Sequence, residues 1–183
     1  MRIISLDPSL RSFGIFYNED GEVNSEVIQR EEKDRMDVLG WFCLKFAKEA
    51  RLGWDLLIVE SYAFGSANSR SITVQAEIGG LVRGLFSAYG VPIIEVPIGT
   101  WKSVTGISMK KGTPMHESDY LNAIVTKFGV RFKTVDEADA YLLYQTVMTC
   151  GARVFPGVGA ANIRRRLEEL KIDTRKLWRA NER

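Results

Sequence analysis

The stretch "RIISLDPSLRSFGIFYNEDGEVNSEVIQ", residues 2 to 29, decides the fold. Residues 2 to 7 are an apolar run that ends in an acid, and residues 12 to 18 alternate as the residues of a half-buried strand do. The run "EDGE" at 19 to 22 carries a turn signal, and residues 22 to 29 have the pattern of another strand. The chain is therefore predicted to open with three strands in a meander.

The chain that follows switches between helical and strand patterns. Apolar residues recur at helical spacing over 34 to 52, and "WDLLIVE" at 54 to 60 has the pattern of a short buried strand. Beyond it we expect a helix over 69 to 89, a strand over 91 to 96, and helices over 116 to 128 and 136 to 149. The predicted fold class is α/β, with a five-stranded mixed sheet in the order β-β-β-α-β-α-β-α-α and helices flanking it.

Length and charge divide the chain into two parts. With 183 residues, 45% of them hydrophobic, the chain is long enough for one sizeable core. The net charge is only +2, but residues 151 to 183 hold nine Lys or Arg and four Asp or Glu, which leaves 16 basic and 19 acidic residues in 1 to 150. We expect one domain over 1 to 150 and a basic, partly helical tail over 151 to 183, suited to holding a polyanion.

Several classes of protein are disfavoured by the sequence. The apolar runs fall well short of the roughly 20 residues that a membrane span needs, and the first residues lack a signal pattern, so we expect a cytoplasmic protein that does not enter membranes. Cys43 and Cys150 lack the spacing of a disulfide or metal site, and we expect both to be buried reduced thiols. No small-molecule cofactor is expected.

Four acids are predicted to meet at one edge of the sheet. Asp7 and Glu60 end the first and fourth strands, and the carboxyl ends of parallel neighbours share an edge. Asp136 and Asp139 lie three apart at the start of the last core helix, hence on one face. Carboxylates that approach one another raise each other's pKa values unless a cation lies between them. A pair of Mg²⁺ ions would satisfy such a group and could activate water against a phosphodiester, without a catalytic histidine.

Each acid also has a purely structural explanation. Asp7 precedes Pro8 and could start a turn, and Glu60 could simply close a strand. Asp136 is a good N-cap residue, while Glu137 and Asp139 suit the first turn of a helix because of its dipole. The catalytic interpretation depends on the acids occurring together and in this order. Glu137 points about 100° away from Asp136 around the helix, so capping alone explains it.

Four segments carry a resemblance to a known family. They are "IISLDPSLRSFGIF", "LLIVESYAF", "SVTGISMKKG" and "VDEADAYLLY", and the resemblance runs from Met1 to about Thr149. The sequence resembles the RuvC-type Holliday junction resolvases, of the ribonuclease H-like superfamily, and looks like a divergent phage or viral member. Ser9 stands where the family usually has glycine. The resemblance implies that residues 1 to 150 form a nuclease domain.

The resemblance also implies roles for the four acids and a quaternary structure. Asp7, Glu60, Asp136 and Asp139 fall on the family's catalytic acids, which implies ligands for two Mg²⁺ ions, with Mn²⁺ as a substitute. A homodimer is implied as well, because a four-way junction has two-fold symmetry. From the sequence, the nominated interface is "AEIGGLVRGLF", residues 76 to 86, although its glycines could equally pack within one subunit.

Residues that hold the DNA are expected around the acids and in the tail. Phe64, four residues after Glu60, matches the family's junction-wedging aromatic, although it could instead pack beneath its loop. Three basic groups are candidates for phosphate contacts. They are Arg11 and Arg70, then Lys102, Lys110 and Lys111 on an expected loop, and finally Arg164, Arg165 and Arg166 on an amphipathic tail helix that also has Ile163, Leu167 and Leu170. Solvated surface charge is the alternative for each group.

The function expected from these features is DNA cleavage during recombination and repair. The resemblance implies a metal-dependent endonuclease that resolves Holliday junctions and other branched DNA by paired nicks leaving 5′-phosphates, in a bacterial or phage-infected cell. One alternative is a ribonuclease H-like enzyme that acts on RNA or RNA–DNA hybrids, since it would use the same carboxylates. Another is a junction-binding module without activity. An actin-type ATPase would need a second phosphate loop and about twice the length.

Overall fold

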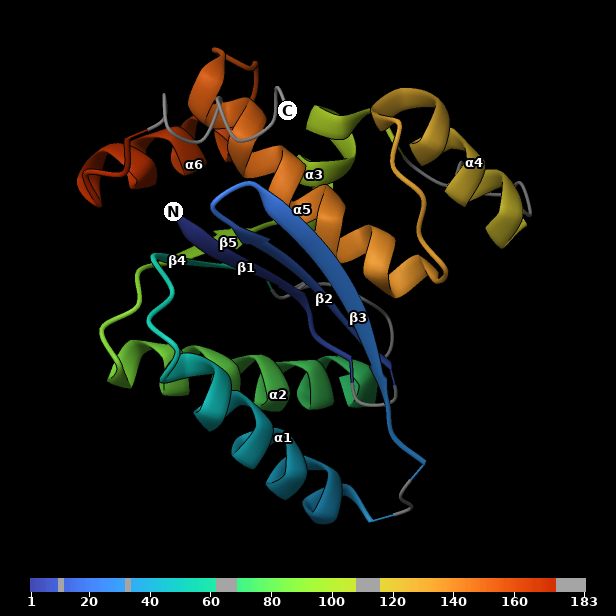
Figure 1. The fold of residues 1–183 in the computed structure, drawn as a ribbon, viewed down its shortest axis with the longest axis vertical. Coiled ribbons are helices and arrows are strands. Elements are labelled where there is room, and N and C mark those ends of the chain that lie inside the picture. Colours follow the sequence, from blue (N-terminus) through green and yellow to red (C-terminus); the bar gives the residue numbers. More distant parts are fainter. Residues whose placement is uncertain (10–11, 32–33, 62–68, 108–115, 174–183) are drawn as a thin grey trace.

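The structure, a computed structural model, describes residues 1–9, 12–31, 34–61, 69–107 and 116–173. A twisted five-stranded sheet runs through the middle of the molecule in the order β3-β2-β1-β4-β5 (Figure 1). The strands are β1 (Arg2–Asp7), β2 (Ser12–Glu19), β3 (Glu22–Gln29), β4 (Leu56–Glu60) and β5 (Ile93–Val96). The three strands predicted for the opening of the chain are confirmed.

Pairing within the sheet puts two predicted acids on neighbouring strand ends. β1 pairs with β2, and β2 with β3, in antiparallel fashion, whereas β1 pairs with β4, and β4 with β5, in parallel. In the β1 to β4 register, Leu6 lies opposite Val59. Asp7 and Glu60 each follow by one residue, and therefore end adjacent parallel strands at the same edge.

Helices cover both faces of the sheet (Figure 1). In the described part of the chain they are α1 (Arg35–Ala50), α2 (Ser69–Ala88), α3 (Ile98–Thr105), α4 (Glu117–Phe128), α5 (Val135–Ala152) and α6 (Val158–Glu169). The first two lie on one face and the other four on the opposite side, with α5 directly against the sheet. This is the predicted α/β fold with a mixed sheet.

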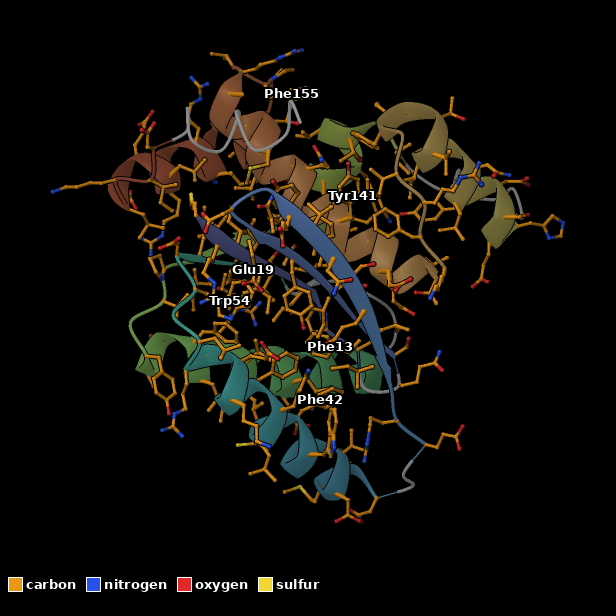
Figure 2. The ribbon with its side chains drawn as sticks, viewed as in Figure 1. Phe13, Glu19, Phe42, Trp54, Tyr141 and Phe155 are labelled. Carbon is orange, nitrogen blue, oxygen red and sulfur yellow. The ribbon has the colours of Figure 1, made fainter. Side chains whose placement is uncertain are left out.

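Each face has its own aromatic core (Figure 2). Toward α1, the Phe13 ring lies 5.2 Å from that of Phe42, and both side chains are fully buried. Toward α5, the ring centroids of Phe16 and Tyr141 lie 5.1 Å apart in an edge-to-face arrangement. Alternation along β2 sends Phe13 and Phe16 to opposite faces, because successive strand residues point to opposite sides. Both cores fix the sheet that carries the acids.

The helix α3 was missing from the sequence prediction. Residues 98 to 105 follow β5 at once, behind Pro97 as N-cap, and the helix ends at Gly106 in the left-handed region with φ 63°. A helix of two turns gives little periodicity, and the glycines at both ends read as loop signals. The expectation that Lys102 lies on a loop is therefore wrong, because Lys102 is helical.

The basic helix expected in the tail is present as α6. Ala160, Ile163 and Leu167 are buried in the core shared with α5, as expected of an amphipathic stripe. Residue 150, the expected domain boundary, lies inside α5, and the division of the chain there stays a prediction. Within the described ranges, no helix combines the length and the apolarity that a membrane crossing requires.

Candidate functional site

The carboxyl edge of the sheet brings the four predicted acids within electrostatic reach of one another. Burial, then the charges of Glu60, Asp139 and Asp136, raise the pKa of Asp7 well above its usual value. A hydrogen bond between the Asp7 and Glu60 carboxyl groups adds to this effect. Two strands and one helix thus bring the four acids within electrostatic reach of one another, and their catalytic role stays a prediction.

Close backbone contact seats the start of α5 on the sheet. Gly14 on β2 is the register partner of Asp7 on β1. A β-carbon built on Gly14 would overlap the main-chain carbonyl group of Asp136 and come within 3.2 Å of its Cα atom. Only glycine leaves room for this approach. The absent side chain of Gly14 therefore sets the distance between the helix acids and the strand acids.

A separate hydrogen bond orients each of three acids. The Trp101 indole Nε1 on α3 donates to Glu60 Oε1 at 3.0 Å. The Ser12 hydroxyl on β2 donates to Asp136 Oδ2 at 2.5 Å. Tyr120 on α4 donates its phenolic proton to Asp139 Oδ1. These donors restrict the carboxylates without neutralising them.

The Tyr120 and Trp101 side chains are buried, so their hydrogen bonds to the acids are shielded from solvent. Their exposed fractions are 2% and 4%. Burial first, and then the neighbouring charge of Asp139, raise the pKa of Tyr120, which keeps the phenol a donor at neutral pH. Neither residue is predicted from the sequence as part of the site. An aromatic residue in a short or amphipathic helix reads as core, and only the tertiary arrangement turns its polar atom toward an acid.

Burial also raises the pKa of two further acids of the site, Asp139 and Glu60. The pKa of Asp139 rises to about 6, chiefly through burial, while the hydrogen bond from Tyr120 opposes the rise. Burial also raises the pKa of Glu60, and the Trp101 hydrogen bond and the Lys102 charge oppose it. Lys102 likewise lowers the pKa of Asp139, so its ammonium group bears on the site from α3.

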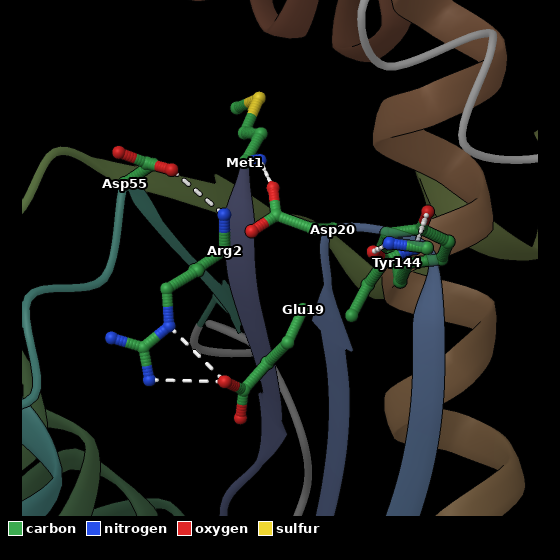
Figure 3. A network of polar contacts seen from close by, with 8 residues as sticks. Met1, Arg2, Glu19, Asp20, Asp55 and Tyr144 are labelled. Carbon is green, nitrogen blue, oxygen red and sulfur yellow. Dashed lines mark hydrogen bonds and ion pairs between the residues drawn. The ribbon is translucent and has the colours of Figure 1, made fainter.

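Acids at the opposite edge of the sheet, by contrast, are paired (Figure 3). Arg2 Nη2 lies 3.1 Å from Glu19 Oε2, and the Arg2 main-chain N–H donates to Asp55 Oδ2 at 2.7 Å. The amino group of Met1 pairs with Asp20. Among the described residues, none of the four acids at the carboxyl edge forms an ion pair with Lys or Arg. Within the described part of the chain, the acids of the carboxyl edge thus differ from those of the opposite edge in lacking an ion-pair partner.

The chemistry of this donor set suits a hard divalent cation. Mg²⁺ prefers carboxylate oxygens, and a cation would relieve the repulsion that adds to burial in raising the pKa of Asp7. As the side chains are placed, no three or more His, Cys, Asp or Glu of the described ranges are grouped closely enough to ligate one ion. The four acids fit the ion by the type of their donor atoms.

Glu137 caps the helix, as expected. Its carboxylate accepts hydrogen bonds from the main-chain N–H groups of Lys133 at 3.0 Å and Thr134 at 3.1 Å. The Thr134 hydroxyl in turn accepts from the Glu137 N–H group at 3.2 Å, which completes a capping box. The N-cap is therefore Thr134, so the alternative explanation of Asp136 as the N-cap residue is wrong.

The predicted DNA-binding residues are only partly described. Arg11, Phe64, Lys110, Lys111 and the side chain of Arg70 lie outside the described residues. On α6, Arg164 Nε donates to the main-chain oxygen of Cys150 at 3.2 Å, which ties the helix to α5. Arg165 and Arg166 both approach Glu169, at 3.7 Å and 3.2 Å. Two arginines thus share one acid, and their DNA-binding role stays a prediction.

Comparison with known proteins finds likeness in structure alone. No protein-family model and no curated protein matches the sequence. The Thermus thermophilus RuvC in complex with a Holliday junction substrate has a TM-score of 0.64 and 13% identity, over 83% of this chain and 95% of that chain. A second Thermus thermophilus RuvC structure has a TM-score of 0.60 and 15% identity, over 83% and 96% of the two chains. The chain has the ribonuclease H-like fold of these RuvC structures, as predicted.

Proposed function

We propose that this protein is a metal-dependent, structure-selective DNA endonuclease, which resolves Holliday junctions and other branched DNA by paired nicks leaving 5′-phosphates. The observation that carries the proposal is the gathering of Asp7, Glu60, Asp136 and Asp139 at the carboxyl edge of a RuvC-like sheet. The fold alone is compatible with many activities, so the site carries the functional argument. One of the similar RuvC structures is a complex with a Holliday junction, which favours branched DNA as the substrate.

In this proposal the four acids hold two Mg²⁺ ions, or Mn²⁺ in their place. Bound divalent ions supply activation of a water and stabilisation of charge on the leaving oxygen of a phosphodiester. Trp101, Tyr120 and Ser12 hold three of the carboxylates in orientation through the hydrogen bonds described above. Lys102, whose charge already reaches Glu60 and Asp139, attracts the phosphate toward the acids.

A homodimer follows from the symmetry of the proposed substrate. A four-way junction has two-fold symmetry, and paired nicks require two sites related by the same operation. One protein chain carries one such group of acids. The proposed assembly is therefore a C₂ dimer, working in the cytoplasm of a bacterial or phage-infected cell as a divergent phage or viral-type member of the resolvases.

A comparison of substrates tests the proposed function. A labelled four-way junction, a linear duplex of the same sequence and the matching RNA–DNA hybrid are incubated with the protein and Mg²⁺. We expect paired nicks in the junction alone, with products that a DNA ligase can rejoin because they carry 5′-phosphates. Cleavage of the hybrid in preference to the junction would favour the ribonuclease H-like alternative, and tight junction binding without any cleavage would favour an inactive binding module.

A further inference from the structure

A groove of about 700 Å³ lies between α2, β5 and α6, beside the candidate site. Its polar lining consists mainly of Ser61, Arg83, Asn162, Arg165 and Arg166. Three of these are arginines, and Glu95 is the one acid among the described residues of the lining. The lining therefore carries a net positive charge.

The groove follows the edge strand of the sheet toward the acids. β5 is the last strand in the sheet, and Ile93 at its start and Pro97 just beyond its end both line the groove. Ser61 follows Glu60 directly and donates its main-chain N–H to the Val96 oxygen at 3.0 Å. One end of the groove thus lies at the edge where the four carboxylates gather.

Arg83 connects the groove to that edge. Its Nη2 atom donates to the main-chain oxygen of Glu60 at 2.9 Å, and its Nε atom lies 3.1 Å from Glu95 Oε1. The side chain is 13% exposed, so these contacts hold it in place. The acid of the groove is therefore already engaged by Arg83, and the positive charge in excess comes from α6.

The wall formed by α6 is fixed to the core. Arg164 is tethered to Cys150, and the buried residues Ala160, Ile163 and Leu167 face the sheet side. A β-carbon on Gly159 would collide with the Thr100 side chain, so α6 also packs closely on α3. Arginines on such a wall are held at a defined distance from β5.

The two groove arginines of α6 remain open to solvent. The side chains of Arg165 and Arg166 are 72% and 49% exposed, and both share the single carboxylate of Glu169. An exposed ion pair of this kind contributes little and is readily exchanged for another anion. A phosphate, which accepts two parallel hydrogen bonds from one guanidinium group, is a strong competitor.

We propose that this groove holds the phosphodiester backbone of one arm of the nucleic-acid substrate, beyond the scissile phosphate. The proposal rests on the proposed function and adds a second contact region to it. No aromatic side chain lines the groove in the described part of the chain, so the contacts are to phosphates and not to stacked bases. Continuity with the acid edge favours a nucleic acid over an acidic protein segment as the occupant.

The test compares R165Q/R166Q with Arg51→Gln. Arg51 caps the far end of α1, outside the lining of the groove, and its replacement removes the same kind of charge. Affinity for a four-way DNA junction is measured in EDTA over a series of salt concentrations. Each phosphate contact contributes about 0.9 to the slope of log K against log salt on duplex DNA. We expect R165Q/R166Q to reduce that slope by about 1.5 to 2 units, and a change this large should be absent in Arg51→Gln.

The outcomes separate this inference from the proposed function. The groove proposal is wrong if R165Q/R166Q has the salt slope and affinity of the wild type. If the wild type nicks the junction in that case, the proposed endonuclease function is unaffected. A reduced slope in a protein that cleaves nothing would support the groove and contradict the endonuclease. An oligoglutamate peptide tests the alternative occupant, an acidic protein segment. If the wild type binds it, R165Q/R166Q does not, and both bind the junction equally, the groove holds an acidic protein segment and the proposal is wrong.

Discussion

Gly14 of β2 and Asp136 of α5 are in direct backbone contact, although 122 positions separate them in the sequence, because a β-carbon on Gly14 would overlap the Asp136 carbonyl group. The same glycine lies opposite Asp7 in the sheet. This contact sets the separation between the acid of the first strand and the acids of the helix. The proposed site depends on a residue that has no chemistry of its own.

Gly14→Ala is expected to damage both the fold and the proposed site. The added methyl group must displace α5 from β2, and overpacking of this kind costs about 1 to 3 kcal/mol of unfolding free energy. Nicking should fall further than the lost stability explains, because Asp136 and Asp139 move with the helix. Denaturant unfolding and junction cleavage measure the two effects.

Gly40→Ala is the matched control for that change. Gly40 lies in α1, and a β-carbon there would meet nothing within 4 Å. Alanine in a helix interior is favoured over glycine by about 1 kcal/mol, so this variant should be more stable and cleave as the wild type does. Equal activity of Gly14→Ala and Gly40→Ala would contradict the role given to the contact.

Tyr120→Phe tests whether the orienting hydrogen bonds matter. Loss of the phenol frees the Asp139 carboxylate to rotate, and removal of such a support typically costs 10- to 100-fold in metal affinity or activity. We expect a higher Mg²⁺ concentration for half-maximal nicking. Tyr144→Phe is the control, because that hydroxyl accepts from Asn18 Nδ2 at 2.7 Å, away from the acids. The control should lose stability and keep its Mg²⁺ requirement.

Substitutions of Asp136 and Glu137, neighbours at the start of α5, are expected to have opposite effects on stability and on cleavage. Glu137→Ala removes the capping box and should lower the unfolding free energy by about 1 kcal/mol while folded protein still cleaves. Asp136→Asn should keep or raise stability, because a like charge leaves the site, and should abolish cleavage. Circular dichroism melts with cleavage assays distinguish them. Cleavage by Asp136→Asn at the wild-type rate would remove that residue from the site.

The raised pKa of Asp139 predicts a pH-dependent stability in EDTA. The pKa is 3.8 in the ordinary carboxyl group and about 6 in the folded protein, so the folded state binds the proton more tightly. The resulting stability is fully present below pH 3.8 and is lost as the pH rises through about 6. The loss is on the order of 2 to 3 kcal/mol.

Asp139→Asn should remove this contribution, and Mg²⁺ should restore stability to the wild type at neutral pH, because a cation compensates the charges that deprotonation leaves. Unfolding free energies of both proteins, measured from pH 4 to 8, provide the check. Identical pH profiles of the wild type and the variant would show that Asp139 titrates normally.

The parts of the fold that the sequence predicted rest on local patterns. The run "RIISLD" and the turn at Asp20 and Gly21 specify the opening strands, and the strand ends then place Asp7 beside Glu60. The carboxyl ends of adjacent parallel strands share one edge of a sheet, and β1 and β4 pair in parallel as expected. The capping role of Glu137 followed in the same way from its position on the helix.

What the sequence could not predict depends on contacts between distant segments. α3 is too short for a periodic pattern, so the sequence predicted a loop at Lys102 and no role for Trp101. Tyr120 is a core residue, and only its hydroxyl group reaches Asp139. Gly14 lies within the pattern of a strand, and that pattern carries no sign of the helix packed on it. In each case the relevant partner lies on another element, and local spacing carries no information about it.

The most direct test of the central claim is cleavage and binding of a labelled four-way junction by Asp7→Asn in the presence of Mg²⁺. Asp7 is the acid on which the other three act, and its replacement by an isosteric amide leaves the fold and the basic surfaces in place. The proposed function predicts that the variant binds the junction as tightly as the wild type and yields no nicked product. Nicking at the wild-type rate would contradict it.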